Sequence, residues 1–195
     1  MKINVKTNVK EVSKGLNSIQ KKQIPFATAN AINTTLFQLR KEMGKQTVKK
    51  LDRPTGFTQR GFMVEKASKK KLIGFLFIKD AVAEYLKYQI EGGVRTSGKK
   101  FAIPTSDYPL NKFGNIPGKK SGLVKKKNQK ILTINNMTGV YETHKDRTLK
   151  LLIAFKNKAV YAAKFPFYKI GKSFVDSKFN KNFESALERA LKTAK

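Results

Sequence analysis

Apolar and polar residues alternate at the start of the chain, and helical spacings follow. Ile3 and Val5 alternate with polar residues, which predicts a short β-strand with one buried face. A helical stretch is expected around residues 9–21, and Pro25 suits the first turn of a second helix. Apolar residues then recur at steps of three and four, at Ala29, Ile32, Leu36, Leu39, Met43 and Val48. This stripe predicts a long helix that ends near Leu51 and packs one face on the core.

Two apolar runs after this helix have the pattern of strands. Residues 62–66 and 72–79 flank a polar turn, and the second run is nearly all apolar, which predicts a well-covered strand. A short helix with one apolar face is expected over residues 81–91. The pair Gly92 and Gly93 predicts its left-handed stop.

Residues 94–130 have a different composition, rich in Gly and Pro, with ten Lys and Arg against Asp107 alone. We interpret them as a long extended loop or arm, since loops of this length in a domain are usually functional. Strands are expected at 130–135, around Val140 and at 149–155, followed by one terminal helix or two with a bend near Phe179. The order predicts one α+β domain over residues 1–195, with a mixed or antiparallel sheet packed against long N- and C-terminal helices.

The net charge changes this picture most. The 195 residues include 42 Lys and Arg against 13 Asp and Glu, a net charge of +29 that favours anionic partners. Only six of the basic residues are Arg, so contact with nucleic acid would be to phosphate, without sequence reading. The alternative to a functional anion-binding surface is a solvated lysine surface that results from the codon bias of an AT-rich genome. No apolar run approaches the ~18 to 20 residues of a membrane span, so we expect no membrane partner.

Catalytic and metal-binding motifs are sparse. The single histidine, His144, is expected in a hairpin turn, and the chain has no Cys, no G-x-S-x-G elbow and no phosphate-binding P-loop. A nuclease would need clustered carboxylates around Mg²⁺, whereas Asp52, Glu65 and Asp80 fall on different elements. We therefore expect no enzyme, no metal site and no cofactor.

The basic loop is the better candidate for function. Its lysines are candidate contacts for DNA or an acidic partner: Lys99, Lys100, Lys119, Lys120, Lys125, Lys126, Lys127 and Lys130. Three aromatic residues are interleaved with them: Phe101, Tyr108 and Phe113. Such aromatics form stacking surfaces for single-stranded nucleic acid, or they anchor an arm to a neighbouring subunit. We favour inter-subunit anchors.

The stretch LDRPTGFTQRGF, residues 51–62, joins the long helix to the first of the two apolar runs. We interpret it as a structural corner formed by Asp52, Arg53, Pro54, Gly56 and Phe57. Pro54 should end the helix because it disfavours the helical conformation of the residue before it. Gly56 should allow the turn, Asp52 and Arg53 should form an ion pair or cap, and Phe57 with Phe62 should hold the next strand to the core.

Several of these blocks resemble the minor tail protein Z-like, or tail-completion, family of tailed bacteriophages. QIPFATANAINTTLFQLRKEM (23–43) is similar to its "-PFA-A-A-N-T" helix, and LDRPTGFT (51–58) to its "-RPTPFT-" signature, with Gly56 replacing the second proline. EGGVR (91–95), FAIP (101–104), KFGNI (112–116) and the closing KFPFYKIGKSFVDSKFNKNFESALERAL (164–191) follow in the family's order. Residues 119–130 depart from the family pattern.

The resemblance implies a structural virion protein: a minor tail or tail-completion protein in a ring at the neck, where head and tail join. The implied partners are copies of itself, the neighbouring portal or adaptor and tail proteins, and DNA passing through the channel. The implied location is the virion, and the host cytoplasm during assembly. The alternative is a phage protein that binds nucleic acid non-specifically through its lysine-rich surface.

Overall fold

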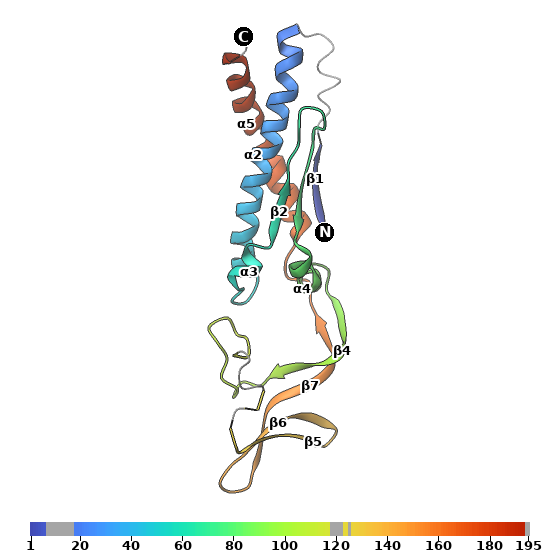
Figure 1. Ribbon diagram of the computed structural model, residues 1–195, viewed down its shortest axis with the longest axis vertical. Coiled ribbons are helices and arrows are strands. Elements are labelled where there is room, and N and C mark those ends of the chain that lie inside the picture. Colours follow the sequence, from blue (N-terminus) through green and yellow to red (C-terminus); the bar gives the residue numbers. More distant parts are fainter. Residues whose placement is uncertain (7–17, 118–122, 125, 194–195) are drawn as a thin grey trace. The chain divides into compact units, whose positions relative to one another are not determined.

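The computed structural model describes residues 1–6, 18–117, 123–124 and 126–193 (Figure 1). Contacts divide the chain into two compact units, Met1–Ile90 with Lys164–Lys195, and Glu91–Ala163. The predicted α+β class is confirmed, with antiparallel sheets and long N- and C-terminal helices. Where one domain was expected there are two compact units, and the segment expected as a loop contributes a long strand to the second unit, which has its own core.

The first unit is organised around α2, the helix Ser18–Lys50. The predicted stripe is buried from Ala29 through Met43, but Val48 is 52% exposed and Thr47 takes the buried position instead. Thr47 is accommodated because its hydroxyl donates to the carbonyl of Met43, 2.7 Å away. Threonines on a buried helix face satisfy their hydroxyls in this way.

The start of α2 differs from the prediction. The helix already begins at Ser18, so Pro25 lies inside it and not in its first turn. Most of the helix expected at residues 9–21 lies outside the described residues. Pro25 lacks an N–H to donate within the helix, and the sequence pattern did not reveal that the helix continues through it.

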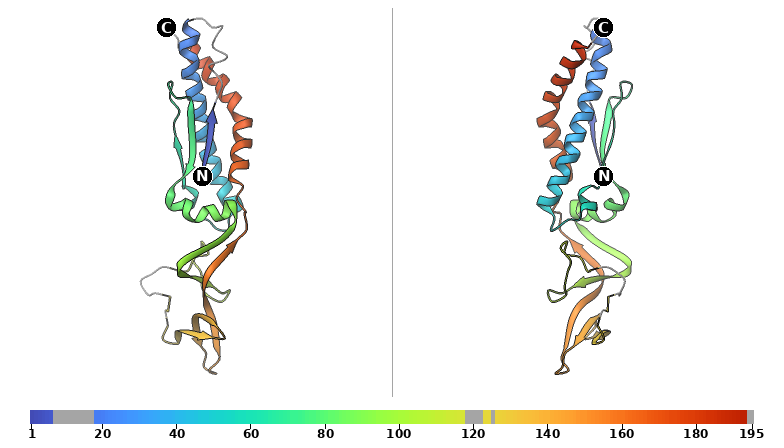
Figure 2. Two further views of the ribbon diagram at one scale, coloured as in Figure 1. Left: turned by 90° about the vertical axis from the view of Figure 1, so that its right-hand side faces the viewer. Right: turned by 60° about the vertical axis from the view of Figure 1, so that its left-hand side comes forward.

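A three-stranded antiparallel sheet packs beside α2 (Figure 2). Its strands are β1 (Lys2–Lys6), β2 (Phe62–Glu65) and β3 (Ile73–Ile78), in the order β1-β3-β2. The apolar run 72–79 is therefore the central strand. At Gly74 a Cβ would lie 2.5 Å from the Leu36 Cδ1 and 2.9 Å from the Ile32 Cγ2. The absence of a side chain there lets β3 approach α2 closely.

The described residues of the first unit also form α3 (Gly56–Gln59), α4 (Asp80–Glu91) and α5 (Phe167–Lys192). The C-terminal segment is thus one helix, and α5 runs beside α2 (Figure 2). Small residues from both helices are buried at their contact: Ala27, Ala31, Ala186 and Ala190. Phe62, Phe165 and Phe167 form an aromatic cluster with ring centroids 6.2 to 6.4 Å apart. Among the described residues no helix is long and apolar enough to cross a bilayer.

The second unit is a four-stranded antiparallel sheet in the order β4-β7-β6-β5. Its strands are β4 (Gly93–Pro104), β5 (Gln129–Ile134), β6 (Met137–Thr143) and β7 (Leu149–Tyr161). The expectation of a loop over 94–130 is thus wrong for β4. The glycine stop after α4 is confirmed, with φ 75° at Gly92 and 104° at Gly93. A small core joins Tyr108 to Val140, Leu152 and Ile153.

Candidate interaction surfaces

The structural corner after α2 is built by local hydrogen bonds. Asp52 accepts two from Arg53, at 3.0 Å from Nε and 2.9 Å from Nη2, so the predicted ion pair is present. Arg53 has a left-handed backbone with φ 43°. Since Pro54 disfavours the right-handed helical conformation at Arg53, the chain turns there. The sequence analysis predicted that Gly56 allows the turn. The structure differs, because Gly56 is the first residue of α3.

The polar side chains of α3 connect the corner to α4. Thr55 caps α3 by accepting a hydrogen bond from the Thr58 N–H at 3.3 Å. The Thr58 hydroxyl lies 2.9 Å from the Tyr85 hydroxyl of α4. Phe62 is 1% exposed, as predicted, but Phe57 is 57% exposed. The prediction that Phe57 packs on the core is wrong, because the single turn of α3 buries Thr58 instead.

Acid–base behaviour at the corner is that of an exposed ion pair. The hydrogen bond from Arg53 lowers the pKa of Asp52, and the same bond raises the pKa of Arg53. Both shifts move the groups away from titration near neutral pH. The same hydrogen bonds hold the turn as an exposed ion pair.

The predicted anion-contact lysines that the structure describes lie on different parts of the second unit. Of these lysines, the structure describes the side chains of Lys100, Lys126, Lys127 and Lys130, all exposed; Lys119, Lys120, Lys125 and the side chain of Lys99 lie outside the described part. Lys126 is paired with Glu142, 3.2 Å from its Oε1. Lys100 and Lys130 lie on β4 and β5, the two edges of the sheet. Neighbouring strands are ~4.8 Å apart, so about 14 Å separates these edges.

The three predicted inter-subunit anchors have different environments. Tyr108 is 3% exposed and packs in the core of its own chain, so the prediction for Tyr108 is corrected. Phe101 is half-buried beneath the Arg95 guanidinium, 5.5 Å from its ring centroid. Phe113 is half-buried in a turn whose backbone N–H is held by Asn111 at 2.9 Å. Phe101 and Phe113 thus keep surface available to a neighbour.

The structure locates the remaining candidates for chemistry in turns and on separate elements. His144 lies in the β6–β7 turn, where its N–H donates to the carbonyl of Thr148 at 2.9 Å. Asp146 in the same turn accepts hydrogen bonds from the Thr148 hydroxyl and N–H, which lower its pKa. Within the described residues, no group of three or more His, Cys, Asp and Glu is placed to hold a metal ion.

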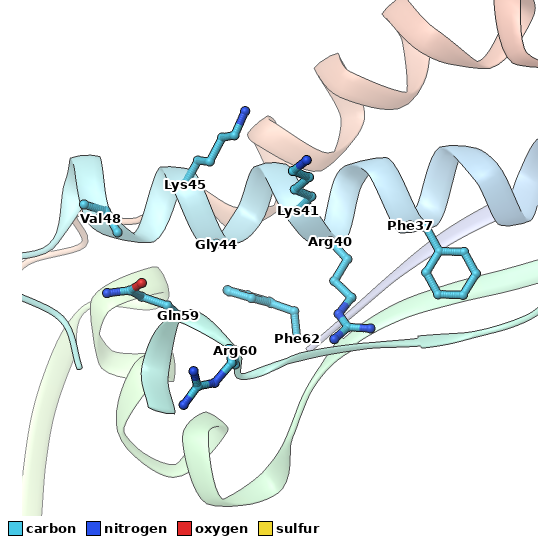
Figure 3. A pocket seen from close by; sticks show the side chains of 9 residues that line it. All are labelled: Phe37, Arg40, Lys41, Gly44, Lys45, Val48, Gln59, Arg60 and Phe62. Atoms are coloured by element: carbon cyan, nitrogen blue, oxygen red, sulfur yellow. The ribbon is translucent and has the colours of Figure 1, made fainter. Parts of the chain in front are cut away.

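A hollow of about 500 Å³ lies between α2 and the α3–β2 segment (Figure 3). It has an apolar floor with Phe37 and Val48, which are 42% and 52% exposed. Arg40 reaches from α2 toward the strand of Phe62, whereas Lys41 and Lys45 extend from the other edge of the helix (Figure 3). Apolar surface is thus flanked by cations on two sides.

A second hollow, of about 720 Å³, lies along α2 between Lys66, which follows β2, and α5. The two hollows share Phe37, and Phe26 lies in the second. The Lys66 amine lies 5.6 Å from the Phe37 ring centroid, and the Lys69 amine lies 4.7 Å from that of Phe26. We call these two hollows, which share Phe37, the α2 groove, with exposed apolar side chains at Phe26, Phe37 and Val48.

Sequence reasoning missed the α2 groove, although the pattern carried a signal for it. Phe26, Phe37 and Val48 are spaced by eleven residues, which is close to three helical turns and places them in one line. Two of the six Arg, Arg40 and Arg60, flank this line. The stripe from Ala29 to Met43 was sufficient to predict the helix. The second line, formed by Phe26, Phe37 and Val48, was therefore not recognised.

No protein-family model, curated protein sequence or solved structure matches the chain.

Proposed function

We propose that this chain is a structural protein of a tailed-phage virion, a ring-forming tail-completion or neck component at the junction of head and tail. The observation that carries the proposal is the ordered series of family-like motifs that extends from residue 23 to residue 191. A structural and not a catalytic role follows from the same resemblance. The burial of several motif residues in the structure supports a structural role.

Residues from two of the motifs lie where the first unit is held together. Ala27 and Ala31, from the "-PFA-A-A-N-T" block, are fully buried against α5. Phe165 and Phe167, from the closing "FPFY" block, pack with Phe62 in the aromatic cluster. These four motif residues are thus core contacts of the first unit, which is what a shared architecture would require.

The second unit has the features of an assembly surface. Its edges are formed by β4 and β5, and strands at sheet edges can pair with a neighbouring chain. Val94 and Val160 face each other across β4 and β7 and are 52% and 76% exposed. Ile131 on β5 is 56% exposed. Apolar side chains on a small sheet favour burial against another subunit, which supports a homo-oligomeric ring.

The positive charge fits either acidic faces of portal and tube proteins or DNA that passes through a channel. Non-specific phosphate contact weakens steeply with salt. Such contact would not hold the DNA at one sequence and is compatible with a conduit. The lysine surface in this proposal therefore assists passage or docking and does not select a site on the genome.

Locating the protein in purified particles by electron microscopy tests the proposal. We expect density for the first unit, with α2 beside α5, repeated around the neck or the head-proximal end of the tail. Particles made without the protein should contain heads and tails that fail to join. A protein that is missing from mature particles, or particles that mature without it, would contradict the proposal.

The alternative, a free nucleic-acid-binding protein, is favoured by the net charge of +29. It predicts binding to duplex DNA that weakens by orders of magnitude between about 50 and 200 mM salt. Neutralising Lys100, Lys127 and Lys130 should then reduce the salt slope. Filter binding at several salt concentrations measures this slope, and a slope near zero would eliminate the alternative.

A further inference from the structure

The α2 groove is a surface whose chemistry defines its occupant. We propose that it binds an amphipathic helix of another protein, with one apolar face and carboxylates on both flanks. The inference concerns this surface alone and does not rest on the proposed function.

The apolar floor has the geometry of a helix-binding groove. Phe26, Phe37 and Val48 are 36%, 42% and 52% exposed along one side of α2. From the first to the last they extend about 33 Å, the length of a helix of about 22 residues. Helices that dock in grooves do so through apolar anchors on one face at spacings of three, four and seven residues. A helix alongside α2 could therefore contact all three side chains.

Close packing of the neighbouring elements makes the walls of the groove. A Cβ on Gly44 would lie 3.2 Å from the carbonyl oxygen of Gln59, so α3 lies close against α2. Asn33 is fixed to the β2–β3 loop by two hydrogen bonds, to the carbonyl of Ala67 at 3.0 Å and from its N–H at 2.7 Å. On the other side, Asn182 of α5 donates to the Thr35 hydroxyl at 2.9 Å. These contacts fix the walls before any partner arrives.

The charges around the groove select for an acidic partner. Arg40 and Arg60 flank the α3–β2 side, Lys41 and Lys45 extend from the other edge, and Arg189 comes from α5. Among the described residues that line the two hollows, none is acidic. Carboxylates on both flanks of an incoming helix would meet these cations, and Arg can hold them with paired hydrogen bonds.

Nucleic acid fits this surface less well. Phe26 and Phe37 lie about 16 Å apart along the helix, too far to stack successive bases. One face of each ring is already covered by a lysine amine, of Lys69 and of Lys66. A second copy of the chain is also a poorer occupant, because its acidic helix α4 already buries the apolar face with Val82 and Leu86.

The test uses a labelled synthetic helical peptide of about 22 residues, with leucines on one face and glutamates on both flanks. Its affinity for the full chain is measured by fluorescence anisotropy. Two comparison peptides have the same composition with leucines scattered around the helix, or lysine in place of glutamate. We expect binding of the first peptide only, weakened about tenfold or more by Phe37→Ser with Val48→Ser.

Charge variants separate the groove from the general positive field. Arg40→Glu with Lys41→Glu should abolish binding of the acidic peptide. Lys178→Glu with Lys181→Glu makes the same change of net charge on an exposed part of α5, and it should leave most of the affinity. Equal loss in both variants, or equal binding of the scattered-leucine peptide, would overturn the proposal. Circular dichroism verifies that each variant is folded.

Two further outcomes would assign the groove to another occupant. If a single-stranded or duplex oligonucleotide competes with the peptide and loses affinity in the Phe37→Ser, Val48→Ser variant, the groove binds nucleic acid and the proposal fails. If sedimentation shows that the wild type self-associates and this variant does not, the groove is an interface between copies, and the proposal equally fails.

Discussion

Close approaches at single residues hold the first unit together. At Gly171 of α5 an added Cβ would overlap the side chain of Ile3, and at Gly74 it would meet Leu36 and Ile32. The GKS sequence at Gly171 has the form of a tolerated helix break, yet this glycine is the contact point of α5 with β1. Glycine at these positions sets how near the elements can lie, and larger residues would force them apart.

Gly74→Ala should destabilise the protein by about 1 to 3 kcal/mol, since overpacking a well-packed core has this effect. The Cβ would lie closer than van der Waals contact to two side chains of α2. Gly56→Ala is the matched control, because its Cβ would lie 3.5 Å from Arg60, an ordinary contact. Urea unfolding followed by circular dichroism measures both. Equal stability of the two variants would contradict the packing at Gly74.

Thr55→Ala should destabilise the corner by about 0.5 to 2 kcal/mol, because the N-cap of α3 is lost. Thr55→Ser keeps the accepting oxygen and should retain most of the stability. Hydrogen exchange at the Thr58 N–H reports the cap directly, since this is the group that Thr55 holds. Faster exchange in the alanine variant alone is expected, and similar exchange in both variants would show that the cap contributes little.

At the scale of elements, sequence periodicity predicted most of the first unit. The alternation of Ile3 and Val5 and the stripe from Ala29 to Met43 became β1 and the buried face of α2, because burial of a regular face is a local pattern. Exposure at the ends of a stripe is decided by non-local neighbours. Val48 and Phe57 are exposed for that reason, and Tyr108 is buried by strands more than thirty residues away.

The candidate surfaces were less predictable than the fold. The ion pair of Asp52 and Arg53 joins adjacent residues and could be read directly from the sequence. The α2 groove depends on how α3, β2 and α5 are placed around one helix, and no local pattern specifies that placement. The length of β4 was missed because its Gly, Lys and Pro content is typical of loops, while its pairing with β7 is made by the backbone.

The contact of α2 with α5 should depend on small side chains. Ala31→Leu should destabilise the first unit by about 1 to 3 kcal/mol, because Ala31 is fully buried beside Ala186 and Ala190. Lys49→Leu, on an exposed position of the same helix, should change the stability by less than about 0.5 kcal/mol. Urea unfolding measures both, and a neutral Ala31→Leu would indicate that the helices can separate without cost.

The β5–β6 pair should show a pH-dependent contribution from Glu142. Hydrogen bonds from Lys126 and then Gln129 lower the pKa of Glu142. A carboxylate whose pKa is lower in the folded state stabilises it above the unfolded pKa, about 4.3 for Glu, and this is lost as pH falls through the folded pKa. Glu142→Gln should therefore be less stable at pH 7, and the difference should vanish in acid. Hydrogen exchange of the β5 and β6 amides, measured from pH 3 to 7 in the wild type and in Glu142→Gln, tests this prediction. A stability difference between the two proteins that does not change with pH would contradict it.

At the scale of the whole molecule, the second unit is an insertion into the first. The first unit is formed by Met1–Ile90 and Lys164–Lys195. The carbonyl of Gln89 accepts hydrogen bonds from Lys164 and Phe165, both at 2.8 Å, which close the first unit where the chain leaves and returns. Gly93 and Tyr161 are register partners at the start of the second unit. Both ends of the insertion are therefore adjacent within their own unit.

Replacing residues 92–162 by a turn of about four residues should leave the first unit folded, since hairpin loops of this length join adjacent chains. Far-UV circular dichroism and hydrogen exchange in α2 measure the result. Truncation after residue 163 is the control and should unfold the first unit, because it removes Phe165, Phe167 and all of α5. Unfolding of the replacement variant to the same extent as the truncated chain would contradict the prediction, because it would show that the first unit needs the second unit in order to fold.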